Sequence, residues 1–173
     1  KSDGTLQGTV LVKDINPSAG SSINSISKVG SSVFFSARDG THGYELWTSD
    51  GTSAGTYLVK DIYPGSDEGN PMLITEFKGE AFFTATDRQD NYELWRSDGT
   101  EAGTHIVKDI STTSSMPREF TVRGNDLFFS AGDGGAQFGR ELWVTDGSSS
   151  GTNMVIDIMQ GTDHSSPSSM VVM

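Results

Sequence analysis

The chain of 173 residues contains no cysteine, so disulfide bonds and thiolate metal sites are excluded. It also has no apolar run near the roughly 18 residues that a membrane-spanning helix needs. Basic residues are scarce: 12 Lys and Arg stand against 23 Asp and Glu, which gives a formal net charge of −11. Nucleic acids are bound through basic surfaces. We therefore expect neither nucleic-acid binding nor insertion into a membrane.

Signs of helix and of catalysis are missing as well. No stretch shows the roughly 3.6-residue apolar period of an amphipathic helix. The Gly-x-Ser-x-Gly and His-Glu-x-x-His motifs do not occur, and the three histidines, at 42, 105 and 164, do not share a position in the repeat described next. No pair of carboxylates stands out for glycoside hydrolysis. We expect the chain not to be an enzyme.

What the sequence does have is a repeat. Tyr44–Ile62 returns as Tyr92–Ile110 and, more loosely, as Arg140–Ile158, and residues 2–15 match the back half of the same unit. The three tryptophans are spaced 48 residues apart, at 47, 95 and 143. A fixed period of this length indicates a repeat architecture.

Within each copy the apolar residues fall into four short strands, separated by turns of Gly, Asp, Ser and Thr. The expected strands are 23–29, 33–37, 44–48 and 56–62 in the first copy, 73–77, 81–85, 92–96 and 104–110 in the second, and 119–122, 127–131, 141–144 and 152–158 in the third. A lone strand is expected at each end, at 9–15 and 168–173.

Strands such as Val33–Ala37 carry large apolar groups on both faces, so each sheet must be covered on both sides. A unit of about 45 residues with four antiparallel strands is typical of a β-propeller blade. We predict an all-β, propeller-like array of four-stranded antiparallel blades, about three full blades plus a stray strand at each end. A parallel β-helix is the weaker alternative, because its coils repeat at roughly half this length.

The predicted boundaries follow from the repeat. Residues 1–15 are the end of a preceding blade, 16–62, 63–110 and 111–158 are blades, and 159–173 is the first strand of a following blade. Propellers close with about four to eight blades. We therefore expect this chain to combine with neighbouring propeller segments or with copies of itself, as oligomers or filaments.

The string Glu-Leu-Trp-x-x-Asp-Gly-Thr-x-x-Gly-Thr is complete at Glu45–Thr56 and Glu93–Thr104. It is looser at Glu141–Thr152, where Ser148 replaces a threonine. It resembles the bacterial repeat family named ELWxxDGT after this string, and the resemblance covers nearly the whole chain. Such repeats occur in large secreted or surface-anchored proteins of gliding, marine and filamentous bacteria. The resemblance implies an extracellular or cell-surface location and a multi-blade β architecture, and it brings no catalytic residues.

Two sets of signature residues have structural interpretations. Asp50, Asp98 and Asp146 open a connection of fixed length and are expected to accept backbone hydrogen bonds in a turn, as a structural clasp. Trp47, Trp95 and Trp143 could stack on sugar rings. However, each follows a leucine on a strand buried on both faces, so we expect them in the core between blades.

The other connections vary in length: 38–43, 87–91 and 132–139 after the second strands, and 16–22, 63–72 and 111–118 before the first strands. Antiparallel order puts both sets on one side, and variable loops on a rigid frame are where binding occurs. The candidate ligand-binding residues are the loop acids Asp39, Asp67, Glu68, Asp87, Asp90 and Asp133. Calcium is the metal to test there, although the alternating acids and closing Glu of a calcium loop are missing. No cofactor is expected to be required.

These observations favour a non-catalytic propeller segment of a secreted or cell-surface protein, with a scaffold, adhesion or self-assembly role. Two alternatives stay open. One is a carbohydrate-binding, lectin-like module. The other is the non-catalytic propeller of a larger polysaccharide-acting enzyme. In each case surface glycans or proteins would be the partners.

Overall fold

The computed structural model describes residues 1–88, 91–135 and 137–171. Its strands form three separate four-stranded antiparallel sheets, each built from strands in sequence order. Sheet 1 contains β1 (Asn24–Val29), β2 (Ser32–Ala37), β3 (Glu45–Ser49) and β4 (Tyr57–Lys60). Sheet 2 contains β5 (Met72–Phe77), β6 (Glu80–Ala85), β7 (Glu93–Ser97) and β8 (His105–Lys108). Sheet 3 contains β9 (Arg118–Arg123), β10 (Asp126–Gly132), β11 (Arg140–Thr145) and β12 (Asn153–Ile156).

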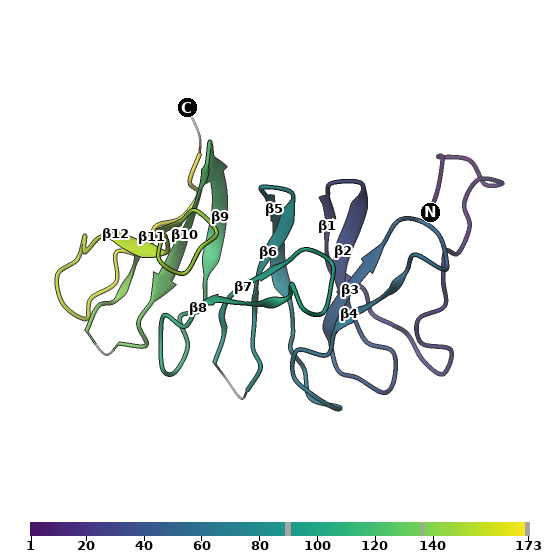
Figure 1. The fold of residues 1–173 in the computed structure, drawn as a ribbon, viewed down its shortest axis with the longest axis horizontal. Coiled ribbons are helices and arrows are strands. Elements are labelled where there is room, and N and C mark those ends of the chain that lie inside the picture. Colours follow the sequence, from purple (N-terminus) through teal and green to yellow (C-terminus); the bar gives the residue numbers. More distant parts are fainter. Residues whose placement is uncertain (89–90, 136, 172–173) are drawn as a thin grey trace.

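The sheets follow one another along the long axis of the molecule, from the N-terminal to the C-terminal end (Figure 1). The all-β prediction and the assignment of four strands to each copy are confirmed. The described residues include no helix long and apolar enough to cross a membrane.

The last strand of each sheet is shorter than predicted. β4 was expected to reach residue 62, but it ends at Lys60, after a register shift between Leu46 and Trp47 in its pairing with β3. Beyond that point the amide of Ile62 donates to the side chain of Glu45 instead of to a neighbouring strand. A side chain has therefore replaced the ladder as the acceptor, and this ends the strand.

The two predicted stray strands are absent from the described residues. Residues 9–15 and 168–171 contain no strand. A strand needs a continuous hydrogen-bonded neighbour. Val10 exchanges two backbone hydrogen bonds with Lys1, at 2.7 and 2.8 Å, but neither segment is assigned to a sheet. The prediction was wrong because apolar alternation alone does not supply a pairing partner.

Each sheet presents two different apolar faces. Adjacent strand residues such as Leu46 and Trp47 point to opposite sides. We call the side bearing Trp47, Trp95 or Trp143 the Trp face, and the side bearing Leu46, Leu94 or Leu142 the Leu face.

The sheets stack with the Leu face of one against the Trp face of the next. Between sheets 1 and 2 the core contains Val29, Phe34, Leu46, Val59, Ile62, Ile74, Ala81, Phe83, Ala85 and Trp95. Between sheets 2 and 3 it contains Phe77, Phe82, Leu94, Val107, Leu127, Phe129 and Ala131, with Trp143 against it. The same arrangement therefore occurs twice, one copy apart.

The tryptophans are buried to different degrees. Trp95 is 4% exposed between sheets 1 and 2, and Trp47 is 6% exposed in a cluster with Ile15, from the N-terminal segment, and Phe35. Trp143 is only half-buried, and its indole N–H donates to the Ala131 carbonyl at 3.1 Å. Trp47 and Trp95 therefore offer no open stacking surface for a sugar, whereas Trp143 is partly exposed.

Backbone geometry repeats as closely as the sequence does. Two non-glycine positions three residues apart take a positive φ at the start of every copy: Ser22 and Ser25, Asn70 and Leu73, Met116 and Glu119, and Ser166 and Ser169. The second position of the first two pairs lies within the register shift between the first and second strands. The pair Ser166 and Ser169 shows that the C-terminal segment enters a fourth copy with the same backbone, although it forms no strand there.

We predict that Trp95→Ala lowers the free energy of unfolding by roughly 3–5 kcal/mol, because it empties a core position between two sheets. Trp143→Ala is the matched control and should cost clearly less, since that ring is half-buried. Chemical denaturation followed by circular dichroism measures both. A loss under about 1 kcal/mol for Trp95→Ala would contradict the stacking described here.

Candidate functional site

The signature glutamates Glu45, Glu93 and Glu141 are fully buried, at 0% exposure. The carboxylate of Glu45 accepts hydrogen bonds from the amides of Ile62 and Gly69, both at 2.7 Å. These two residues lie at either end of the segment that leads from sheet 1 to sheet 2. One buried carboxylate thus closes the connection between two sheets.

The other two glutamates likewise bind the segment that follows the last strand of their sheet. Glu93 accepts from the amides of Ile110, Ser111 and Ser115 at 3.0–3.2 Å and from the Ser115 hydroxyl at 2.6 Å. Glu141 accepts from the amide of Ile158 at 3.1 Å, and from the amide and hydroxyl of Ser165 at 3.1 and 2.6 Å.

The sequence pattern did not predict a role for these glutamates. The signal that could have found them is a charged residue placed inside an otherwise buried strand in every copy. Acids are almost never fully buried unless they are paired.

Protonation of these carboxylates depends on their surroundings. Burial raises the pKa of Glu45 to about 7, against the opposing effect of the Gly69 and Ile62 amides. Burial also raises the pKa of Glu93, although the Ser115 hydroxyl opposes it. For Glu141 the burial effect is outweighed by the hydrogen bonds from Ser165 and the Ile158 amide, and its pKa is lowered.

The Asp-Gly-Thr turns form the clasp that the sequence led us to expect. Asp50 Oδ1 accepts from the amide and hydroxyl of Thr52 at 2.8 and 2.7 Å. The Thr52 hydroxyl accepts from the Gly55 amide at 2.9 Å, and the Thr56 hydroxyl contacts Ser49 Oγ at 2.7 Å. Asp98 and Asp146 make the equivalent bonds, and so does Asp3 in the N-terminal segment. Each turn uses its aspartate internally.

The second glycine of the motif is required by this clasp. A Cβ atom built on Gly55 would lie 2.1 Å from Asp50 Oδ1, and the equivalent glycines 103 and 151 meet Asp98 and Asp146 at the same distance. The carboxylate therefore lies directly over the glycine backbone. This contact explains why Gly-Thr follows Asp-Gly-Thr at a constant distance.

The variable loops do meet on one side, as antiparallel order requires. A Cβ atom on Gly43, in the β2–β3 loop, would lie 2.1 Å from the carbonyl oxygen of Asp67. On Gly139 it would lie 1.8 Å from the carbonyl oxygen of Asp163. The loops between second and third strands of sheets 1 and 3 thus pack on the connections that follow them, on the side opposite the β1–β2 and β9–β10 hairpins (Figure 1).

Two of the candidate ligand-binding acids cap their own loops. Asp39 accepts from the amides of Thr41 and His42 at 2.8 Å and contacts His42 Nδ1 at 2.9 Å. The hydrogen bond that the His42 imidazole makes to the Asp39 carboxylate raises the pKa of His42. Asp133 accepts from the amides of Gly135, Gln137 and Phe138.

The remaining candidates are dispersed. Asp87 is exposed and lies 3.9 Å from Arg88, whose guanidinium also reaches Asp109 at 3.4 Å. Asp67 and Glu68 are exposed on the connection between sheets 1 and 2. Asp90 lies outside the described residues. Within the described ranges no three His, Asp or Glu side chains come together as metal ligands.

No protein-family model matches the chain, and no curated protein matches it. Among solved structures the chain is similar to the crystal structure of the computationally designed Ika4 protein. The identity is 16% and the TM-score 0.49, over 90% of this chain and 83% of that one.

We predict that stability falls as the pH rises from about 4.5 to 7. The folded pKa of Glu45 lies above its ordinary value of 4.5, so the folded state holds this proton more tightly than the unfolded chain does. The loss from Glu45 amounts to roughly 3 kcal/mol and is complete above its folded pKa. Urea denaturation across this pH range measures the effect.

The control is Glu45→Gln, which cannot ionise and should flatten most of this slope, leaving the smaller part due to Glu93. An unchanged slope would show that Glu45 titrates normally.

The clasp aspartates act in a different pH window. Hydrogen bonds within their turns lower the pKa values of Asp50, Asp98 and Asp146, so the stability that these carboxylates contribute is lost as the pH falls below about 4.

We further predict that Gly55→Ala destabilises the chain by roughly 1–3 kcal/mol, because its methyl group would displace the Asp50 carboxylate. Gly20→Ala is the matched control, since a Cβ there meets nothing closer than 3.9 Å and its backbone φ is not positive. In the double variant Asp50→Ala with Gly55→Ala, the two losses should be less than additive. Strict additivity, measured by denaturation, would refute the clasp contact.

Proposed function

We propose that this chain is a segment of a β-propeller that acts without catalysis, as a scaffold and adhesion module of a secreted or cell-surface protein. The observation that carries the proposal is the repeated junction, in which the Leu face of one sheet covers the Trp face of the next. Sheets apolar on both faces and stacked in this way are the building principle of a propeller.

The use of the polar groups supports a scaffold role. The buried glutamates hold the connections, and the clasp aspartates hold the turns. Asp39 and Asp133 brace their own loops. These acids are therefore committed to maintaining the frame, which leaves the variable loops as the surface that differs between copies and could contact a partner.

Two further considerations bear on location and ligand. The resemblance to the ELWxxDGT repeats and the net charge of −11 suit a protein outside the cell. A lectin role through the tryptophans is disfavoured, because Trp47 and Trp95 are buried. Recognition of glycans, proteins or calcium would have to use the variable loops.

Whether the three sheets lie along an arc, as in a propeller, can be tested by measuring distances between spin labels. The chain has no cysteine, so pairs of single-cysteine labels can be placed at the equivalent exposed turn positions Ser53, Glu101 and Ser149. In a propeller the distance from sheet 1 to sheet 3 is clearly shorter than the sum of the two neighbour distances. A straight stack, in which the distances simply add, would overturn the propeller.

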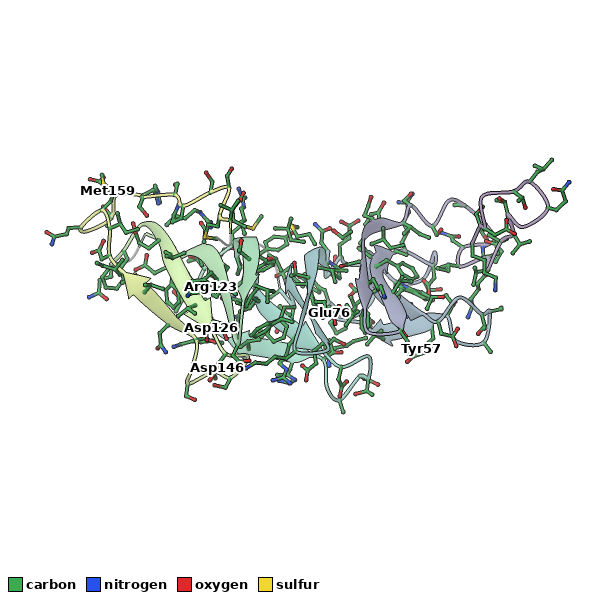
Figure 2. The ribbon with its side chains drawn as sticks, turned by 90° about the horizontal axis from the view of Figure 1, so that it is seen from above. Tyr57, Glu76, Arg123, Asp126, Asp146 and Met159 are labelled. Carbon is green, nitrogen blue, oxygen red and sulfur yellow. The ribbon has the colours of Figure 1, made fainter. Side chains whose placement is uncertain are left out.

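Scaffold and lectin roles are separated by a glycan array at high surface density. We expect no binding. If a sugar binds, the lectin reading replaces the scaffold, and Asp87→Ala then tests whether the variable loops hold it. Asp146→Ala is the control on the fixed turn between β11 and β12, where Asp146 is exposed (Figure 2).

A further inference from the structure

The array leaves one face open at each end. On the Leu face of sheet 3, Val155 is 47% and Ile158 is 53% exposed, while Val107, the equivalent of Val155 in the covered face of sheet 2, is 5% exposed. On the Trp face of sheet 1, Ile26 is 66% exposed, while its counterpart Ile74 in sheet 2 is 8% exposed. These are the two halves of the junction that occurs inside the chain.

The open faces lie at opposite ends of the molecule. Met159, which follows the Leu face of sheet 3, is at the far end from the N-terminal segment (Figure 2). The two faces do not meet within the described residues, but the faces of two chains can meet head to tail.

Residues 1–15, which we call the strap, partly cover the Trp face of sheet 1. Ile15 of the strap packs with Phe35 and Trp47, and Lys13 Nζ donates to the Thr56 carbonyl at 2.6 Å. Lys108, in the equivalent place on sheet 2, donates to the Thr152 carbonyl of sheet 3, also at 2.6 Å. The strap thus occupies the position that the last strand of a preceding sheet would take.

The strap fills only part of this face. A hollow of about 550 Å³ remains beside the strap. Its apolar lining comes from the strap (Val10, Val12) and from sheet 1 and the residue just before it (Ile23, Ile26, Val33 and Phe35). In the internal junctions, side chains of the second and third strands of the preceding sheet, such as Phe34 and Leu46, fill the equivalent place. The corresponding groups on sheet 3 are Phe128 and Leu142, both only half-buried.

The strap and β12 differ at one informative position. Three copies carry a lysine there, at 13, 60 and 108, but β12 carries Ile156, which is 58% exposed. Ile156 cannot donate to the Thr56 carbonyl as Lys13 does. The strap therefore has one charge-assisted hydrogen bond that β12 of another molecule lacks.

From these observations we infer that the Trp face of sheet 1 is a docking surface for the Leu face of sheet 3 of a second copy, and that the strap competes with this copy for it. The inference rests on the proposed function. It adds the binding partner, a second copy of the chain, and the segment that regulates binding, the strap. Release of the strap lets Val155 and Ile158 of the partner replace Val12 and Ile15, while Phe128 and Leu142 enter the hollow.

The test uses the full chain with the strap loosened by Lys13→Ala and Ile15→Asp. Sedimentation velocity over a wide concentration range should show the 18.5 kDa chain becoming a dimer, while the unchanged chain associates at least roughly tenfold more weakly. Adding Val155→Asp and Ile158→Asp should abolish the dimer. Leu73→Asp, a 45% exposed position away from both faces whose positive φ aspartate tolerates, should leave it intact.

A second variant guards against misfolding of the strap mutant. Ile156→Lys gives β12 the missing donor and should promote dimers in a chain with an intact strap. Near-ultraviolet circular dichroism reports folding, and limited proteolysis of residues 1–15 reports release of the strap. A folded chain with a released strap that stays at 18.5 kDa overturns the inference, and so does association unaffected by Val155→Asp and Ile158→Asp.

The outcomes also separate this inference from the proposed function. Association that depends on Val155 and Ile158 but gives open filaments supports the docking surface and contradicts a closed propeller. If the spin-label distances show a curved array but the chain never dimerises, the proposed propeller is supported and the docking surface is contradicted.

Discussion

The structure depends on one constraint: every sheet is apolar on both faces, so it needs a neighbour on both sides. Within the chain this need is met twice by the same contact, with Leu46 and Leu94 of one sheet facing Trp95 and Trp143 of the next. Removing large apolar groups from water is the main driving force for such packing. The order of the sheets, the places of the tryptophans and the two incompletely covered ends all follow from it.

The polar part of the repeat serves this stacking. The contacts between sheets can repeat only if each connection places the next sheet in the same position relative to the one before it. The buried glutamates ensure this by binding both ends of the connection. Tyr57 and Arg96 then reach across to the carbonyls of Gly99 and Gly147 in the next sheet. Glu45, which is fully buried with a pKa raised to about 7, makes this frame sensitive to pH near neutrality.

The loops that vary in length between copies lie on one side of the molecule. There Asp39 and Asp133 satisfy the amides of their own loops, and Asp67 and Glu68 remain exposed. A binding surface on this side would therefore be assembled from loops of several sheets, held at fixed spacing by the stacked cores.

The sequence by itself determined the strands, the four-strand unit and the clasp, because these depend on local alternation and on the turn chemistry of residues such as Asp50 and Gly51. It could not show what Glu45 binds, since Gly69 is far away along the chain and only folding brings them together. It also predicted strands at 9–15 and 168–173 that the described residues do not form. Tertiary structure decided these points, because a strand needs a partner and a buried charge needs donors, and both come from elsewhere in the chain.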